Sequence, residues 1–227
     1  ETNEVMFALQ HSAKHKIASN YGKSYYPSDY SPNAGWADYY GNEDFFKAYP
    51  NDDRKEWNYM TEWKIKSGEI IPYTESADKL PAISKYYDYD EGAPGKSAQS
   101  NGITCIYRYA EVLLMYAEAS TRATNSVNQD ALNAIQEVQK RAGYQDRQIE
   151  LTTTTEPTAF LAAVSNERGW EFFAEMKRWF ELVRLEKVKE VRAEEWDAST
   201  FNTNHHYYFP VPYQQVDLAG WTNNAGY

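Results

Sequence analysis

The stretch RYAEVLLMYAEA, residues 108–119, decides the fold of this chain. A surface helix usually carries apolar residues along one stripe and polar residues opposite. Here Ala, Val, Leu, Met and Tyr occupy nearly the whole circumference, and the charged exceptions fall within one narrow sector. Those exceptions are Arg108, Glu111, Glu118 and, one turn further on, Arg122. The pattern predicts a helix packed between other helices, with its charged row facing solvent or charges on a neighbour.

Two further helices are predicted downstream. Residues 130–143, DALNAIQEVQKRAG, have apolar positions at steps of three and four, and Gly143 stands where a left-handed C-cap belongs. The first two helices, joined by a short turn, predict an antiparallel αα-hairpin. A third helical pattern opens at Thr155 and Pro157 and runs to about residue 196, which is too long for one unbroken surface helix, so we expect a bend or break within it.

The third pattern supplies charges that match those of the first. Glutamates and arginines recur there at steps of three and four. We expect ion pairs with a structural role, which fix helix register more than they add stability. The candidates are Arg108, Glu111, Glu118, Glu171, Glu175 and Arg178.

The remaining chain is irregular. Residues 1–105 contain one strand-like run, EVMFALQH, followed by a segment punctuated by Gly and Pro that predicts loops. In the C-terminal part, Pro210 and Pro212 disfavour a helix. The sequence therefore predicts a mainly α protein with a loop-rich part (1–105), a helical core (106–192) and an irregular C-terminal segment (193–227).

Composition favours a carbohydrate ligand and argues against several other partners. The net charge of −10 and the lack of a separate basic cluster argue against nucleic acid or an anionic membrane surface. The sequence contains no run of about 18 apolar residues, so no membrane-spanning helix is predicted. The chain has 20 Tyr and 7 Trp, many of them interleaved with Asn, Asp, Ser and Gly. Aromatic rings beside short polar groups suit sugars, which stack an apolar face on a ring.

The candidate ligand residues lie on the predicted loops of the first part. They are Tyr25, Tyr26, Asn33, Trp36, Asp38, Tyr39 and Tyr40. The alternative interpretation is that these rings form a small core that holds long loops in place. Trp57 and Trp63 are weaker candidates, and we expect them to be packed beneath the same loops.

The sequence offers little for metal or catalytic chemistry. His11 and His15 lack an evident third ligand, and His205 and His206 are adjacent, so no metal and no cofactor is expected. Cys105 excludes an internal disulfide and is expected to be buried. A glycosidase would need a pair of accessible carboxylates, but the helical glutamates lie among Trp and Phe, so no enzymatic activity is expected.

Three motifs stand out in the sequence: IYRYAEVLLMYAEA with ALNAIQEVQKRAG, then ERGWEFFAEMKRWFELVR, and finally YYFPVPYQQVDL with NNAGY. In their order and spacing they resemble the SusD/RagB family of outer-membrane nutrient-binding lipoproteins. The chain departs from the family pattern at Met176, where glycine is common, at Glu181 and at Ala225. The resemblance covers the C-terminal half of such a protein.

The resemblance implies both a fold and a function. The fold would be SusD-like, with a tetratricopeptide-like hairpin, long helices, a loop-rich lobe and a few short strands. The protein would be a non-catalytic component of a SusCD-type complex that delivers oligosaccharide to a SusC-like TonB-dependent transporter. It would lie on the cell surface at the outer membrane, held only by a lipid anchor outside this chain. The alternatives are a tetratricopeptide-type scaffold that binds peptides and, less favoured, a glycoside hydrolase.

Overall fold

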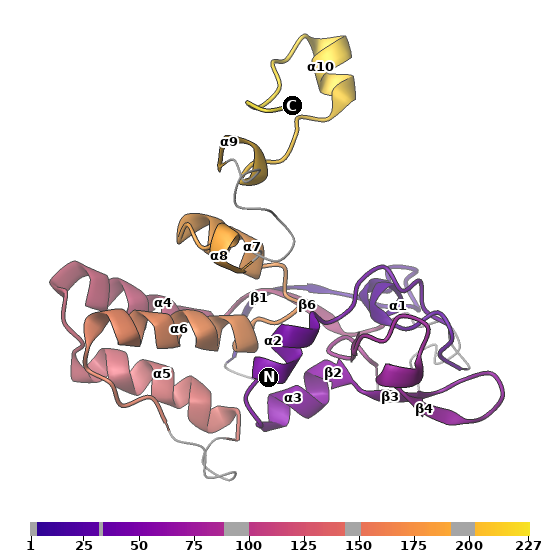
Figure 1. The fold of residues 1–227 in the computed structure, drawn as a ribbon, viewed down its shortest axis with the longest axis horizontal. Helices are drawn as coiled ribbons and strands as arrows, with labels where there is room; N and C mark the ends of the chain where they lie inside the picture. Colours follow the sequence, from indigo (N-terminus) through magenta and orange to yellow (C-terminus); the bar gives the residue numbers. More distant parts are fainter. Residues whose placement is uncertain (1–3, 32–33, 89–99, 144–150, 192–202) are drawn as a thin grey trace. The chain divides into compact units, whose positions relative to one another are not determined.

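A computed structural model describes residues 4–31, 34–88, 100–143, 151–191 and 203–227. The chain divides into two compact units, residues 1–175 and 176–227. Figure 1 labels most of the elements of both units. Each unit is described separately below.

The first unit combines short strands with six α-helices among its described residues. Its helices are α1 (Tyr21–Tyr25), α2 (Glu43–Ala48), α3 (Asp53–Asn58), α4 (Tyr109–Thr124), α5 (Gln129–Arg141) and α6 (Pro157–Glu171), with a 3-10 turn at Tyr73–Glu75. Its strands are β1 (Val5–Gln10), β2 (Tyr59–Met60), β3 (Glu62–Lys64), β4 (Ile70–Pro72), β5 (Ala82–Ile83) and β6 (Ile103–Arg108). They form three antiparallel pairs, β1–β6, β2–β5 and β3–β4. The mainly α prediction is confirmed.

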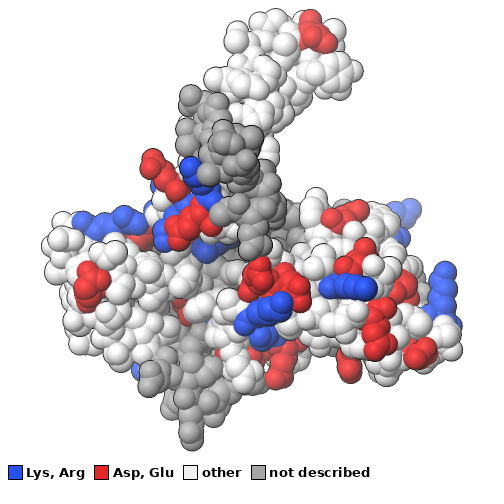
Figure 2. All heavy atoms as spheres, viewed as in Figure 1, with Lys and Arg blue, Asp and Glu red and all other residues white. Residues whose placement is uncertain are grey.

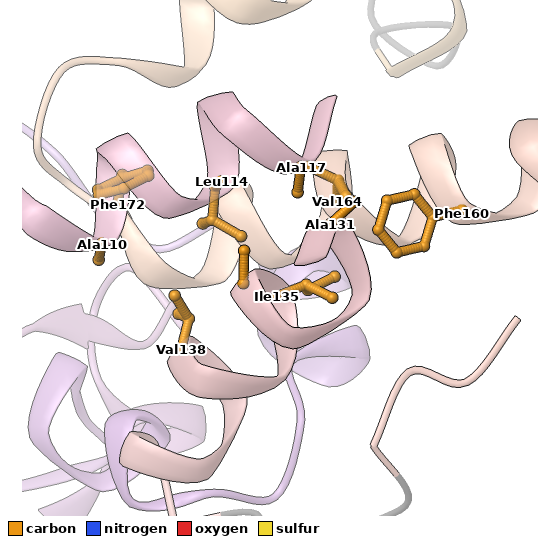
Figure 3. Close-up of a cluster of buried hydrophobic side chains, with 10 residues drawn as sticks. Ala110, Leu114, Ala117, Ala131, Ile135, Val138, Phe160, Val164 and Phe172 are labelled. Atoms are coloured by element: carbon orange, nitrogen blue, oxygen red, sulfur yellow. The ribbon is translucent and has the colours of Figure 1, made fainter. Parts of the chain in front are cut away.

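Helices α4, α5 and α6 enclose the main apolar core (Figure 3). Leu114 of α4, Ile135 of α5 and Phe160 of α6 are all completely buried. The α4–α5 hairpin predicted from the sequence is present, and Gly143 has φ +90°, the left-handed conformation expected after the second helix. Asn128 begins α5 by accepting a 2.7 Å hydrogen bond from Ala131 N.

Pairing of β1 with β6 joins the start of the chain to the helical core. Val5 lies opposite Arg108, and Phe7 lies opposite Tyr107. The strand therefore holds the loop-rich first part against the entry to α4. The strand-like run at residues 4–11 is confirmed as β1.

The long helical pattern breaks after α6, as expected. Ala174 and Met176 both have left-handed backbones, with φ of +59° and +61°. The helical stretch resumes as α7 (Arg178–Arg184) and α8 (Val188–Val191). Met176 thus occupies a left-handed position that glycine would fill without steric cost.

The second unit contains two further helices, which correct the prediction for the C-terminal segment. α9 spans Thr203–His206, and α10 spans Tyr213–Ala219. Pro212 is the N-cap residue of α10 rather than a breaker, because the first amide groups of a helix have no partner inside it. The ring of His205 stacks on Tyr227, with centroids 4.2 Å apart.

The glycine- and proline-rich segment also contains helices that the sequence analysis missed. These are α1 and α2, each of which is only five or six residues long. In α2, Asn42 accepts a 2.9 Å hydrogen bond from Phe45 N. Helices this short are set by their caps and their packing, because they have too few residues for a period to show.

Acidic and basic side chains are interspersed over the first unit on the face shown in Figure 2. Within the described ranges, no helix is both long and apolar enough to cross a membrane.

Candidate ligand-binding surface

The loop after α1 is fastened to that helix by its own backbone. Trp36 N donates to Lys23 O at 2.7 Å, and both Asp38 N and Tyr39 N donate to Ser24 O, at 2.9 and 3.2 Å. The donors and acceptors are all backbone atoms, so the path of the loop does not depend on its side chains.

Gly35 is required for this close approach. A Cβ atom at Gly35 would lie 1.9 Å from Tyr26 O, far inside any real contact distance. Ala37 N then donates to the same Tyr26 O at 3.1 Å, and Ala37 has φ +55°. An alanine with left-handed backbone angles is strained, and the surrounding hydrogen bonds stabilise that conformation.

Three predicted ligand residues are exposed on this loop: Trp36, Asp38 and Tyr39. We call them the aromatic platform. Trp36 is 52% exposed and Tyr39 61%. Lys23 Nζ lies 5.0 Å from the centre of the Trp36 ring. Two accessible rings with a carboxylate between them in sequence offer both stacking and hydrogen bonding to a polyhydroxylated ligand.

Tyr25 and Tyr26 instead lie beneath the loop. Both are buried, and the Tyr25 ring contacts Tyr39 at 5.8 Å and stacks on Tyr86 at the same centroid distance. Burial raises the pKa of the Tyr25 hydroxyl. These two rings fit the alternative interpretation, a small core that supports the loop.

Tyr40 and Asn33 complete the predicted set. Tyr40 Oη donates a 2.5 Å hydrogen bond to Asp78 Oδ2, and burial together with that carboxylate raises the pKa of the Tyr40 hydroxyl. Asn33 lies outside the described residues. The structure thus brings Trp36, Asp38, Tyr39 and Tyr40 onto one loop above a tyrosine core.

A cleft of about 540 Å³ lies in the same unit and was not predicted. Tyr30, Trp63 and Tyr87 line it, together with Glu56 and Glu62. Trp63 is buried, as expected, and donates to Asp29 Oδ1 at 2.7 Å. Tyr30 Oη donates to Tyr87 Oη at 3.3 Å.

The cleft and the platform share supporting residues. The Tyr26 ring contacts both Tyr30 and Tyr87, at centroid distances of 5.4 and 5.5 Å. The density of tyrosines in YYDYD, residues 86–90, is the signal that points to Tyr87. The other residues that line the cleft come from three separate segments, so their proximity to Tyr87 could not be predicted from their spacing in the sequence.

The predicted ion pairs centre on Glu171. Its carboxylate accepts from Arg54 at 2.9 Å and from both Arg108 and Arg141. Its side chain is 2% exposed. Burial alone would raise the pKa of Glu171, but the three arginines outweigh it and lower that pKa to about 2.

The other predicted charges form shorter chains of pairs. Arg108 also binds Glu175 at 2.7 and 3.0 Å. Arg168 lies 3.8 Å from Glu111. Glu118 accepts from Arg122 at 2.8 Å, and Arg178 donates to Glu181 at 3.1 Å within the second unit. The charged row of α4 therefore meets α6 through Arg108 and Glu111.

A second cleft of about 500 Å³ opens beside this network. Trp57 lies at this cleft and is 61% exposed, so the expectation that it is packed beneath loops was wrong. Cys105 also lines the cleft and is half-buried rather than fully buried. Burial raises the pKa of its thiol.

His11 and His15 line neither cleft of the first unit. His11 Nε2 is 2.9 Å from Thr104 Oγ1. Among the described residues, no group of three His, Cys, Asp or Glu side chains is placed to hold a metal ion.

Comparison with known proteins identifies relatives that match most of this chain. A sequence model of the SusD family matches residues 61–227. SusD-like protein P2 of Formosa agariphila is 28% identical over 200 residues, which are 80% of this chain and 39% of that protein. SusD-like protein P25 of the same organism is 27% identical over 144 residues, which are 61% of this chain and 26% of that protein.

Solved structures show the same fold. A SusD superfamily protein of Parabacteroides distasonis superposes with a TM-score of 0.77 at 23% identity, covering 99% of this chain and 50% of that one. Surface glycan-binding protein A of Bacteroides thetaiotaomicron, in complex with laminarihexaose, gives 0.71 at 21% identity, covering 97% and 52%. The chain thus spans between about a quarter and about half of the length of these relatives.

Proposed function

The chain belongs to the SusD family, and from that premise we propose that it is a non-catalytic glycan-binding part of an outer-membrane uptake protein. The observation that carries the proposal is the aromatic platform. Trp36 and Tyr39 are exposed although each is large and apolar, and the loop that presents them is fixed by backbone hydrogen bonds. A preorganised pair of rings loses little conformational entropy when a sugar stacks on it.

Relatives with named ligands support this assignment. Surface glycan-binding protein A was solved with laminarihexaose, and another structural neighbour is a laminarin-binding SusD-like protein, at 18% identity and a TM-score of 0.70. Those ligands belong to those proteins. For this chain they make laminarihexaose a sensible member of any test panel.

The first experiment compares two exposed tryptophans. Trp36→Ala removes a ring from the platform, whereas Trp57→Ala removes a similarly exposed ring at the charged cleft. Calorimetric titration with an oligosaccharide panel that includes laminarihexaose should show Trp36→Ala weakened by about 1–3 kcal/mol, the scale of stacking on an aromatic ring. Trp57→Ala should bind like the parent. Equal loss in both variants, or loss in neither, contradicts the platform as the site.

Absence of catalysis requires its own test, because the unpredicted cleft carries Glu56 and Glu62 beside aromatic rings. The buried glutamates of the ion-pair network, such as Glu171, bind arginines. With a pKa of about 2, the Glu171 carboxyl is a poor proton donor at neutral pH. Prolonged incubation with the oligosaccharide panel should release no reducing ends. Turnover that disappears in Glu56→Gln or Glu62→Gln would establish a glycosidase instead.

The peptide-scaffold alternative has less support. Tetratricopeptide scaffolds stack several helical hairpins into a continuous surface. Within the described residues, α4 and α5 form one hairpin followed by the single helix α6.

We also propose that the complete protein partners a SusC-like TonB-dependent transporter at the outer membrane and carries a lipid anchor outside this chain. Family membership supports this proposal. Affinity purification of the tagged full-length protein from detergent-solubilised outer membranes should recover a TonB-dependent transporter in near-stoichiometric amount. Recovery of the protein alone from the soluble fraction would contradict it.

A further inference from the structure

The cleft of about 540 Å³ in the first unit, which we call the tyrosine cleft, has walls that are joined to one another. Its lining residues include Tyr30, Glu56, Thr61, Glu62, Trp63 and Tyr87. Backbone hydrogen bonds connect the segments that form it, because Ser31 N donates to Lys64 O at 2.8 Å and Ser84 N donates to Asn58 O at 3.0 Å. The walls are therefore fixed before a ligand binds, which limits the entropy that binding costs.

The tyrosine cleft lies outside the helical core. Glu62, Trp63 and Ile70 line it from the β3–β4 hairpin, which Figure 1 shows at the opposite end of the first unit from α5. The buried residues of the α4–α6 core do not line it. The cleft is therefore not a packing defect of that core.

Aromatic rings supply much of the apolar surface of the cleft. Tyr30 and Tyr87 are partly exposed, whereas Trp63 is 3% exposed and donates its hydrogen bond to Asp29. The Tyr26 ring contacts both tyrosines from behind the platform loop. Rings supported in this way offer a fixed apolar surface on which the face of a sugar can stack.

Polar side chains reach the same cleft. Glu56, Thr61 and Glu62 are exposed and line it. An ionised carboxylate only accepts hydrogen bonds, whereas a threonine hydroxyl both donates and accepts. The hydroxyl groups of a sugar can pair with either kind. Apolar and aromatic walls with a few polar groups, in a cavity of about 300–1,000 Å³, are typical of small-molecule sites.

The charges of the cleft favour a neutral ligand. In the part of the chain that the structure describes, its charged lining residues are Glu56, Glu62 and Lys64. Two carboxylates and one ammonium group give this lining a formal charge of −1, in a chain whose net charge is −10. A glycan that carries sulfate or uronate groups would be repelled there.

The charged cleft beside Glu171 has a different character. Arg54 and Arg108 donate to Glu171, and Arg108 also donates to Glu175. A ligand in that cleft would have to displace existing ion pairs. The tyrosine cleft presents its carboxylates at exposed positions instead.

We propose that the tyrosine cleft is a second carbohydrate site, which takes a neutral oligosaccharide and is separate from the aromatic platform. The Tyr87 ring stacks on the sugar, and Thr61 and Glu62 bind its hydroxyl groups. The three platform residues do not line this cleft. The ligand class rests on the proposed glycan-binding function, whereas the location does not depend on the platform.

Hydrogen–deuterium exchange of the complete protein, with and without saturating laminarihexaose, locates the bound sugar. Backbone amides of residues 59–64 and 84–87 should exchange more slowly when the sugar is present. This protection should be the same in the parent and in Trp36→Ala. Protection confined to residues 36–39, or protection of the cleft segments that disappears in Trp36→Ala, would overturn a separate site.

Glu62→Ala and Glu69→Ala form a matched pair, each combined with Trp36→Ala. Both glutamates are exposed in the β3–β4 hairpin, but Glu69 does not line the cleft. In calorimetry Glu62→Ala should weaken laminarihexaose binding about tenfold, the scale of a hydrogen bond to a charged group. Glu69→Ala should leave that binding unchanged. Equal effects of the two substitutions would overturn the assignment.

The ligand class is tested with the same hexaose oxidised to uronic acids at C6. It should bind the Trp36→Ala protein about tenfold more weakly than laminarihexaose, because like charges are brought together. Comparable binding of the two would overturn the preference for a neutral ligand.

The same variants separate this proposal from the platform. If Trp36→Ala binds laminarihexaose like the parent and Glu62→Ala alone does not, the tyrosine cleft is supported and the platform is contradicted. If neither the parent nor any variant binds laminarihexaose, both proposals are contradicted.

Discussion

Replacing Glu171 with Gln tests whether the buried charge network holds the helical core together. The substitution keeps the shape of the side chain and removes the charge that faces three arginines. Arg54 and Arg108 are about nine-tenths buried, and each retains two carboxylate partners. These are Asp52 and Glu167 for Arg54, and Glu4 and Glu175 for Arg108. Breaking a buried pair usually costs about 3–5 kcal/mol, and the surviving partners place this case near the lower end.

The pKa of Glu171 gives an independent magnitude. A pKa lowered from 4.5 to about 2 corresponds to about 3 kcal/mol of stability at pH 7. Because the folded-state pKa is the lower one, this contribution is fully present above pH 4.5 and is lost as the pH falls toward 2. At pH 3 roughly half of this contribution should remain. Burial raises the pKa of Glu167, which has the opposite effect on the pH dependence, so only the difference between parent and variant isolates Glu171.

Urea unfolding of the parent and of Glu171→Gln at pH 7 and pH 3 measures both numbers. Glu43→Gln is the matched control, because Glu43 pairs with Lys47 at 3.1 Å on the surface and should cost less than about 0.5 kcal/mol at either pH. A Glu171→Gln penalty below 1 kcal/mol at pH 7, or one that does not shrink at pH 3, would refute the reasoning.

Three stability predictions concern single positions, each checked by thermal or urea unfolding. Met176→Gly should stabilise by about 0.5–1 kcal/mol, because it relieves a left-handed backbone; a loss of stability would show that the Met176 side chain matters more than its φ. Glu118→Ala should cost less than about 1 kcal/mol, because Arg122 is half-exposed and regains water; a loss of 3 kcal/mol would mean a buried partner. Leu114→Ala should cost about 3–5 kcal/mol through a cavity between three helices, and a loss under 1 kcal/mol would place Leu114 outside the core.

The helical core was readable from the sequence because its signals are local and repeated. Apolar residues recur at steps of three and four along residues 108–141, and together with Gly143 they predicted the hairpin. The length of the third helical pattern predicted the break that lies near Met176. The short helices α1, α2 and α10 were missed because each depends on a cap or on packing at one or two residues.

The candidate binding surface could be predicted from the sequence only as a region. Composition pointed to residues 25–40, but exposure within a loop depends on where its backbone runs. Two neighbouring tyrosines, Tyr25 and Tyr26, lie in the small core, while Trp36 and Tyr39 face outward. Trp57 and Trp63 differ in exposure for the same reason. Trp63 is the buried middle residue of β3, whose side chains alternate between exposed and buried, whereas Trp57 lies on the exposed side of α3. No periodic pattern predicts such differences in a chain with so many turns.

The loop after α1 is fixed by backbone hydrogen bonds, whereas its exposed surface is formed by side chains that take no part in those bonds. The amides of Trp36, Ala37, Asp38 and Tyr39 make the contacts that fix it, and Gly35 gives the clearance. Substitution at positions 36, 38 and 39 therefore leaves these anchoring contacts in place. If the loop binds glycan as proposed, descendants of this protein can exchange those side chains and change their ligand preference while Gly35 stays constant. Diversity concentrated at three positions around one invariant glycine is then the evolutionary signature to expect.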